Sequence, residues 1–495
     1  MFNTRIHQCL RPLGDLVAKS KRCFSAGTLP SSGYKSMGSF HGDNVEILIR
    51  QDDCSYEKPR LPDIVKSKYD DIMRKAYPTK PSFGNDSKSL FMLDSEYTFI
   101  NHGAFGLTLR VAHDFCNAWR EYAETQPLRY FDRHLLPHLV YSYRSFGKYV
   151  NCKPDQLALI PNATYGINSI VRSVVQNEDD HVLLLDLAYG AVKKIVETVC
   201  KEKGSKFDIV EVPLSIGSGV QGIDFETSLL QVLEKSITPK HKLIIFDHTT
   251  SNTAINLPIE KMATICKKYG GKVVIDGAHG LFARDIDISS LFDKYGVDFY
   301  VGNCHKWFCS TKGLGFICVK DTRISGKNEL VPCIISHGYG DGFTSNFIWD
   351  GCRDYTGALS VPFLLEFWNR YDMDSIRSYQ ASTLQDSLNM LTNMWHENRP
   401  SVTSQGSASD DMIVPFAYHS PMALIKLPNK WQIFDTNNGK FHATSSDAKA
   451  VQDYLYFEKK IEVPVKNIGN ALYCRLSCHI YNSICDYKKL GEALL

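Results

Sequence analysis

"DFYVGNCHKWFCS", residues 298–310, passes from an apolar strand-like segment into a basic pair and then into two aromatic residues. His305 and Lys306 follow the apolar segment directly, and Trp307 and Phe308 come after them. Lysine is among the residues least often buried without a partner. A lysine held between a strand end and two aromatic rings therefore indicates an amine with a chemical role.

Short apolar runs recur on both sides of this segment, with helix-like stretches between them. The runs cover residues 181–186, 207–213, 242–247, 272–276, 298–302 and 314–319. Strands that alternate with helices predict right-handed βαβ units around a mainly parallel sheet. The sequence therefore predicts an α/β fold.

Four stretches of different character divide the chain. We predict a targeting leader over 1–30, a linker and N-terminal arm over 31–95, a large α/β domain over 96–370 and a small α+β domain over 371–495. The arm is rich in Ser, Gly, Pro and charge, with one helix-like stretch near residues 62–76.

Composition excludes several classes of protein. Lys+Arg 56 against Asp+Glu 54 gives a net charge of +2, and no dense basic run is interleaved with aromatics, which disfavours a nucleic-acid partner. No run approaches eighteen apolar residues, so we expect no membrane span. The 15 cysteines form no CxxC pair, which favours reduced thiols over a disulfide framework or a zinc site.

The first thirty residues form a basic and amphipathic leader. Apolar residues recur at spacings of three and four, and five basic residues stand against one acid, Asp15. The leader resembles a mitochondrial presequence, with "RCFS" at 22–25 similar to a matrix-protease cleavage site. We predict a mitochondrial location. A disordered basic terminus or a surface helix on a cytoplasmic protein is the alternative.

Polar residues follow several of the apolar runs, where ligands bind in open α/β sheets. Asp276 ends one run and His279 follows it, Tyr189 follows another, and Thr164 opens a helical pattern after Asn162 and Ala163. Together with Lys306, these are the groups that pyridoxal phosphate requires. We therefore predict a pyridoxal-phosphate site.

Each of these residue types has a chemical reason to be there. The Lys306 amine can form an imine with the aldehyde of the cofactor once desolvation favours its neutral form. Asp276 can keep the pyridine nitrogen protonated, which makes the ring an electron sink. The helix N-terminus and the Thr164 hydroxyl suit the phosphate, and His305 can add a donor.

Structural roles are the alternative for every one of these residues taken alone. An aspartate after a strand is often a helix cap, and a lone histidine, tyrosine or threonine is often a packing or capping residue. A zinc site made of His279, Cys304, His305 and Cys309 fits no familiar ligand spacing. The order of the whole set along the chain favours the cofactor.

These residues lie in segments that resemble a known family over roughly 95–495. The chain is similar to the class V aminotransferase and cysteine desulfurase group of fold-type I pyridoxal-phosphate enzymes. Its isopenicillin N epimerase-like branch, with plant-type cysteine desulfhydrases and ergothioneine-pathway C–S lyases, is the most similar. The segments that carry the likeness are "FINHGAFG" (99–106), "LDLAYGAVKK" (185–194), "DHTTSNTAINLPI" (247–259), "DGAHG", "HKW" and "RLSCHIYNS" (475–483). The resemblance implies a seven-stranded-type sheet and a small C-terminal α+β domain.

The resemblance implies roles for individual residues. It makes Lys306 the Schiff-base lysine, Asp276 the pyridinium partner, Tyr189 the residue stacked on the cofactor ring and His279 a partner of its 3-hydroxyl. It places four residues around the phosphate, namely Ala163, Thr164, Asn303 and His305. Arg475 matches the arginine that binds the substrate α-carboxylate, and Asn101 is expected near the substrate.

Two positions depart from the family pattern. Asn303 stands where the family usually has serine, and Cys352 stands where a threonine reaches the phosphate of a neighbouring subunit. Both changes are expected to weaken phosphate contacts modestly. The resemblance implies a homodimer with composite sites that acts on a small amino-acid substrate.

The positions of the cysteines limit the reactions that we expect. A persulfide-forming desulfurase needs a mobile cysteine ahead of Arg475, but no cysteine lies between Cys352 and Cys474, and Cys474 falls in a predicted strand. We expect β-elimination by a C–S lyase acting on cysteine or an S-substituted cysteine. Epimerisation, racemisation and transamination share the proton removal from Cα and stay open.

Two other functional classes remain as alternatives. A cofactor-free scaffold protein would not need Lys306, Asp276 and Arg475. A nicotinamide-binding dehydrogenase is suggested by "GSGVQG" (217–222) and by Asp247 at the end of a later run. Residues 214–216 separate these glycines from the preceding strand, which favours a surface loop.

Overall fold

The computed structural model describes residues 42–76, 81–214, 224–325, 328–396, 411–435 and 440–495. The predicted leader and the "GSGVQG" segment lie outside the described residues. The described part of the chain falls within one compact unit, 41–495. Its helices include none that is long and apolar enough to cross a membrane.

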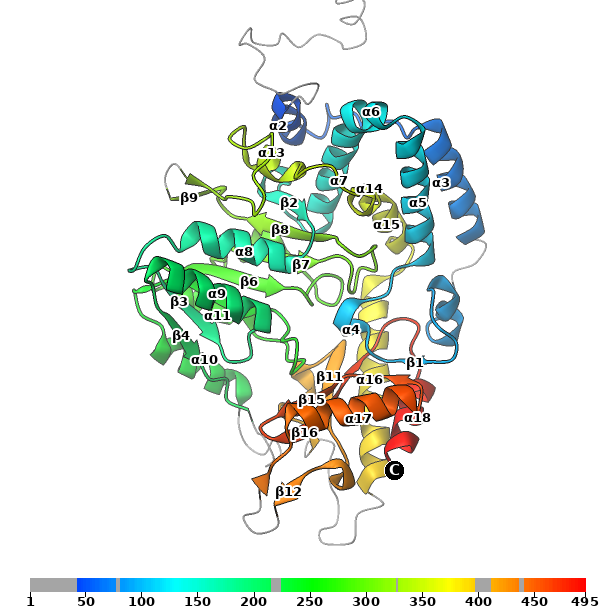
Figure 1. Ribbon diagram of the computed structural model, residues 1–495, viewed down its shortest axis with the longest axis vertical. Coiled ribbons are helices and arrows are strands. Elements are labelled where there is room, and N and C mark those ends of the chain that lie inside the picture. Colours follow the sequence, from blue (N-terminus) through cyan, green and yellow to red (C-terminus); the bar gives the residue numbers. More distant parts are fainter. Residues whose placement is uncertain (1–41, 77–80, 215–223, 326–327, 397–410, 436–439) are drawn as a thin grey trace, which may run out of the picture. The chain divides into compact units, whose positions relative to one another are not determined.

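A seven-stranded sheet forms the centre of this unit (Figure 1), in the order β2-β8-β7-β6-β5-β3-β4. Its strands are β2 (Leu157–Ile160), β3 (His181–Leu185), β4 (Phe207–Val210), β5 (His241–Asp247), β6 (Lys272–Gly277), β7 (Phe299–Asn303) and β8 (Gly315–Val319). Neighbouring strands from β4 to β7 are parallel, and β8 runs antiparallel to both of its neighbours, β7 and the edge strand β2. The predicted α/β fold is confirmed. Strand β2 adds an edge to the six predicted runs.

Helices cover the sheet because its central strands are apolar on both faces. Helices α8 (Ala163–Val174) and α9 (Gly190–Lys203) pack against the strands and against each other, with α10 (Phe225–Ser236) and α11 (Ile259–Lys267) beside them. A second group packs together near β2 (Figure 1), namely α5 (Arg110–Thr125), α7 (Leu135–Tyr149), α14 (Thr356–Leu359) and α15 (Val361–Trp368).

The predicted N-terminal arm contributes two helices to this second group. Helix α3 (Asp63–Ala76) matches the expected helix and packs on α5, while α2 (Gly42–Arg50) packs on α7. The guanidinium of Arg144 in α7 donates to the carbonyl of Ile49 at 2.9 Å. Residues 42–50 therefore belong to the packed structure rather than to a free linker.

A smaller antiparallel sheet lies at the C-terminal end (Figure 1, bottom). Strand β16 (Ala471–Ser477) lies between β11 (Met422–Lys426) and β15 (Val465–Ile468). Helices α16 (Met373–His396), α17 (Ser445–Phe457) and α18 (Ile484–Leu494) accompany it, and leucines of these helices share an apolar core with the sheet. This arrangement matches the predicted α+β part. Strand β1 (Thr98–Phe99) pairs in parallel with β14 (Ile461–Glu462).

Segments far apart in the sequence meet at the carboxyl edge of the central sheet. Asp247 at the end of β5 is the register partner of Asp276 in β6. The Ser477 N–H donates to the Ile100 carbonyl at 3.0 Å, which joins β16 to the chain that enters α4 (His102–Phe105). The smaller sheet thus contributes to the same edge as the loop after β7.

Candidate active site

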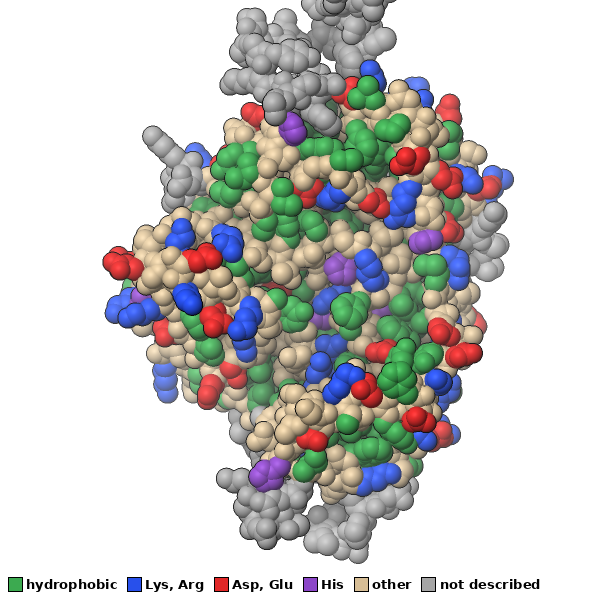
Figure 2. Space-filling model, viewed as in Figure 1, with side chains coloured by type: hydrophobic (Ala, Val, Ile, Leu, Met, Phe, Trp, Pro, Cys, Tyr) green, Lys and Arg blue, Asp and Glu red, His purple; other side chains and the backbone are tan. Residues whose placement is uncertain are grey.

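A pocket of about 250 Å³ opens at this edge of the central sheet. All eight residues predicted to bind the cofactor line it, namely Lys306, Asp276, His279, Tyr189, Ala163, Thr164, Asn303 and His305. Figure 2 shows Lys, Arg and His side chains gathered near the middle of the face, in the region where Figure 1 places α4. The eight cofactor residues chosen from the sequence therefore line one pocket, whose lining does not include the predicted substrate residues Arg475 and Asn101.

The lysine amine lies in a low-dielectric environment. Burial, reinforced by the positive charge of Arg475, lowers the pKa of Lys306 to about 8, and the charges of Asp276 and Asp247 oppose this shift. An amine with such a pKa is partly neutral near physiological pH, whereas an ordinary lysine is fully charged. Lys306 can therefore act as a nucleophile or as a base.

The neighbouring histidine also favours a neutral amine. The indole N–H of Trp307 donates to Nδ1 of His279 at 3.4 Å, which leaves the proton of the neutral imidazole on Nε2. Nε2 lies 3.0 Å from Nζ of Lys306. An imidazole N–H can bond to that nitrogen only when the amine carries a lone pair. Burial and the charge of Lys306 also hold the pKa of His279 well below its usual range.

Two carboxyl groups face the same pocket from neighbouring strands. Oδ1 of Asp276 accepts a hydrogen bond from the Ala278 N–H at 3.0 Å, and burial raises the pKa of Asp276. Burial and the charge of Asp276 raise the pKa of Asp247 well above its usual range. Sequence reasoning weighed Asp247 only as a nicotinamide residue. It could have been found, because it ends the β5 run as Asp276 ends the β6 run.

The N-terminus of α8 provides the donors at the phosphate end. Oδ1 of Asn162 accepts from the Tyr165 N–H, and Oδ1 of Asn303 accepts from the Ala163 N–H, both at 2.9 Å. Within the described part of the chain, neither the N–H nor the hydroxyl of Thr164 has a protein partner. At the helix terminus the N–H and hydroxyl of Thr164 can therefore donate to an anion, whereas the Ala163 N–H already donates to Asn303.

His305 lies beside this helix terminus in its neutral form. Its Nδ1 is 2.9 Å from the Leu314 carbonyl, to which it donates, and burial lowers the pKa of His305 to about 4. In the neutral ring Nε2 is then an acceptor. The predicted donation to a phosphate requires protonation of this ring, which a nearby dianion would favour.

Arg475 is buried without an acidic partner among the described residues. Its Nη1 donates to the Ser251 carbonyl at 2.5 Å and its Nη2 to Oδ1 of Asn101 at 3.2 Å, while Nε has no partner there. Burial lowers the pKa of Arg475 to about 10. Nδ2 of Asn101 donates in turn to Glu462 at 2.9 Å. Asn101 therefore orients the guanidinium. Because Arg475 has no acidic partner among the described residues, its charge favours binding of an anion.

The mouth of the pocket carries two exposed aromatic rings. Tyr189 precedes α9 and is 47% exposed, and Phe105 of α4 is 76% exposed. A ring at this position can pack on a flat ligand, so the stacking role of Tyr189 stays a prediction. Phe105, like Ser251, was not identified from the sequence.

The cysteines of the described chain do not form the zinc site weighed above. Of the four residues considered, only Cys309 belongs to the one His/Cys cluster there whose ligand atoms could share an ion, together with His102 and His479. Cys474 is buried in β16, and burial raises the pKa of its thiol. This thiol is held in a strand and is not a mobile nucleophile.

The donor set fits pyridoxal phosphate. Lys306 would hold the aldehyde carbon, Asp276 the pyridine nitrogen, His279 a hydroxyl close to the amine, and Thr164 at the α8 terminus the phosphate. The buried Arg475 adds a cation for a substrate carboxylate.

Comparisons with known proteins agree with this donor set. The sequence matches the family described as aminotransferase class-V over residues 144–425. It is 25% identical to a probable chloroplastic L-cysteine desulfhydrase of Arabidopsis thaliana, over 87% of this chain and 90% of that protein. It is 23% identical to an isopenicillin N epimerase of Amycolatopsis lactamdurans, over 81% and 95% of the two chains. The solved complex of the cystine C–S lyase C-DES with cysteine persulfide shares the fold, with a TM-score of 0.61, 17% identity and 81% and 97% coverage.

Proposed function

Because the chain belongs to the aminotransferase class-V family, we propose that it is a pyridoxal-phosphate-dependent lyase that breaks the Cβ–S bond of cysteine or an S-substituted cysteine. With L-cysteine and water, the products are pyruvate, ammonia and hydrogen sulfide. The probable L-cysteine desulfhydrase of Arabidopsis thaliana supports this reaction, because its sequence is similar to 87% of this chain.

The observation that carries the proposal is the buried guanidinium of Arg475, whose charge acts on the amine of Lys306. A buried charge without a counter-ion is costly, and a carboxylate can satisfy a guanidinium with two parallel hydrogen bonds. The described residues supply no such carboxylate to Arg475, and its Nε lacks a partner among them. The α-carboxylate of an amino acid supplies it.

The residues around the pocket divide the chemistry between them. Pyridoxal phosphate, when bound, supplies an electron sink for the substrate Cα. Lys306, with its pKa of about 8, accepts the Cα proton. Arg475 fixes the substrate by its carboxylate, so that the Cα proton faces the amine. The C–S bonding electrons then leave with sulfur as a thiolate.

The first test measures the visible spectrum of the purified full-length protein with added pyridoxal phosphate. We expect a yellow band in the natural protein and in Lys268→Ala, whose lysine lies at the surface and pairs with Glu234. Lys306→Ala should lose the band. A natural protein that stays colourless would favour the cofactor-free scaffold.

The second test identifies the reaction by incubation with L-cysteine and S-substituted cysteines. We expect equal amounts of pyruvate and sulfide or thiol from the natural protein. Arg475→Gln should raise the KM roughly 10- to 100-fold, because it removes a charged hydrogen-bond partner of the carboxylate. Deuterium exchange at Cα without pyruvate would reject the lyase in favour of epimerisation, and pyridoxamine formation would indicate transamination.

We further propose a mitochondrial location and a homodimer. The basic, acid-poor residues 1–30 support the location. Full-length protein with a C-terminal fluorescent tag should enter mitochondria, and a version lacking residues 2–30 should stay in the cytoplasm. An unchanged distribution would contradict the role of these residues.

A further inference from the structure

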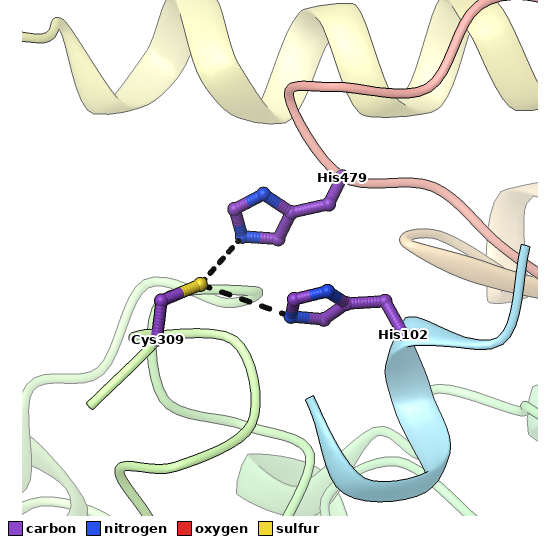
Figure 3. Close-up of side chains that lie close together, drawn as sticks. All are labelled: His102, Cys309 and His479. Carbon is purple, nitrogen blue, oxygen red and sulfur yellow. Dashed lines mark hydrogen bonds between the residues drawn. The ribbon is translucent and has the colours of Figure 1, made fainter. Parts of the chain in front are cut away.

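Three buried side chains meet at the loop after β7 that carries Lys306, here called the lysine loop (Figure 3). His102 belongs to α4, Cys309 follows Lys306 in the loop after β7, and His479 follows β16. Sγ of Cys309 lies 3.8 Å from Nε2 of His102 and 3.5 Å from Nε2 of His479. The two imidazoles stack, with ring centroids 4.3 Å apart. All three residues are fully buried.

Both imidazoles form hydrogen bonds to backbone carbonyls of the lysine loop. Nε2 of His102 lies 3.1 Å from the Lys306 carbonyl, and Nε2 of His479 lies 3.1 Å from the Trp307 carbonyl. A carbonyl only accepts, so Nε2 carries the proton in both rings. Nδ1 of His102 is then free to accept from the Tyr481 hydroxyl at 2.9 Å. Burial lowers the pKa of both histidines, which keeps the rings neutral.

The same hydrogen bonds argue against a metal ion in this cluster. The three possible ligand atoms lie within 4.8 Å of one another. A metal ligand must be unprotonated, whereas the Nε2 atoms of His102 and His479 that face Cys309 both donate to carbonyls. The cluster is therefore a hydrogen-bonded support.

We propose that His102 and His479 are positioning residues that set the Lys306 amine relative to the Arg475 guanidinium. The inference rests on the proposed function, because it takes Lys306 as the cofactor lysine. The amine comes from the central sheet and the guanidinium from β16 of the smaller sheet. His479 lies four residues after Arg475 and bonds to the carbonyl next to Lys306, so it joins the two halves of the site directly.

The adjoining groups extend this support to the reacting atoms. The Trp307 indole, whose own backbone carbonyl is held by His479, donates to His279, and His279 contacts the amine of Lys306. A shift of the loop would therefore move both the amine and its neighbour. Displacements of about 1 Å in an active site can cost roughly 10²-fold in rate.

The experiment compares variants of the full-length protein loaded with pyridoxal phosphate. His479→Phe keeps an aromatic ring but removes the donor. We expect kcat to fall roughly 10- to 100-fold and the pH midpoint of the visible band to shift. His479→Gln restores an N–H donor and should recover most of both values. Tyr481→Phe removes only the hydroxyl that donates to Nδ1 of His102, and should lower kcat roughly threefold or more with a smaller shift of the midpoint.

The matched control is His138→Phe. His138 is buried, has a pKa lowered by burial to about 4, and bonds to the Arg60 backbone, but it lies in α7 away from the pocket. It should lower the melting temperature without changing kcat or the midpoint. Because Tyr481→Phe is nearly isosteric, its kcat and midpoint test the proposal even if His479→Phe does not fold.

The outcomes separate the two proposals. A natural protein with no band or no turnover would contradict the proposed function. An active natural protein whose Tyr481→Phe and folded His479 variants keep its kcat and its midpoint would overturn the positioning role. Stoichiometric zinc or copper in the purified protein would also overturn it, because the Nε2 atoms would then be ligands.

Discussion

At the scale of single residues, the proposed chemistry depends on the state of one amine. Lys306 is buried next to His279, whose tautomer presents an N–H to Nζ. Burial and Arg475 lower the pKa of Lys306 to about 8. Above this pKa the amine is neutral and nucleophilic, and below it the amine is protonated and inactive toward an aldehyde.

The lowered pKa predicts how the cofactor-free protein takes up pyridoxal phosphate between pH 7 and 10. The uptake rate should rise with pH, bend near pH 8 and be level above about pH 9, because the neutral fraction of Lys306 saturates. Stopped-flow absorbance on cofactor-depleted protein measures this profile. A rate that keeps rising toward pH 10.5 would mean that Lys306 has the pKa of an exposed lysine.

The two carboxyl groups predict unequal effects of the same substitution. Burial and the charge of Asp276 raise the pKa of Asp247 well above its usual range, which favours its neutral form, so Asp247→Asn should change kcat less than about threefold. Asp276→Asn removes the charge that serves the pyridine nitrogen, and should lower kcat by about 10²-fold or more. Steady-state pyruvate formation compares the two variants. Equal losses would contradict the assignment of the charge to Asp276.

At the scale of elements, the end of α4 fits closely against the lysine loop. Gly106 has a φ of +68°, and a Cβ added there would lie 2.2 Å from the His305 carbonyl oxygen and 2.6 Å from Cα of Lys306. Only glycine allows both this backbone conformation and this approach. The "FINHGAFG" segment therefore packs directly against the backbone of His305 and Lys306.

Gly106→Ala should displace the lysine loop. We expect strain of about 1–3 kcal/mol, a lower melting temperature and weaker binding of pyridoxal phosphate. Gly204→Ala is the control, because Gly204 has a similar φ of +71° but only Cβ of Glu178 near it, at 3.9 Å. Thermal melts and cofactor titrations measure both variants. Equal cofactor affinity in the two would show that the close approach has no effect on the site.

At the scale of the whole molecule, the proposed homodimer needs an apolar contact surface. Apolar side chains lie over the region of α13 (Phe343–Ile348) in Figure 2. Ile335 is 62% exposed, and the preceding Ile334 N–H donates to the Tyr165 hydroxyl of α8 at 3.4 Å. The exposed Ile335 therefore lies next to a residue that contacts α8, the helix whose N-terminus faces the pocket.

Ile335→Glu should weaken self-association and also lower cofactor affinity, since an unpaired polar group in an apolar interface costs about 1–3 kcal/mol and a charge costs more. Analytical ultracentrifugation over a concentration series measures the association. Phe457→Glu, at a residue 60% exposed at the end of α17, should leave the dimer intact. A natural protein that sediments as a monomer at micromolar concentration would contradict the proposed dimer.

Much of the fold and the site could be predicted because the signals are local. Apolar runs and helical spacing lie within single segments, and ligand-binding residues of parallel sheets follow the strand ends. For this reason Asp276, His279, Tyr189 and Lys306 could be predicted from the sequence, and the structure places all four at one pocket. Helix α2 and the short strand β2 were missed, because runs of nine and four residues are too short for an apolar pattern alone to identify the element.

The sequence alone determined the kinds of side chain at the ends of the strands, and hence the cofactor that they suit. Only the tertiary structure decided the state of those side chains. Three features depend on contacts between distant segments: Arg475 without an acidic partner among the described residues, Asn303 bonded to Ala163, and two histidines bonded to the carbonyls of Lys306 and Trp307. Burial and pairing set charge and tautomer, and these are properties of the packed chain.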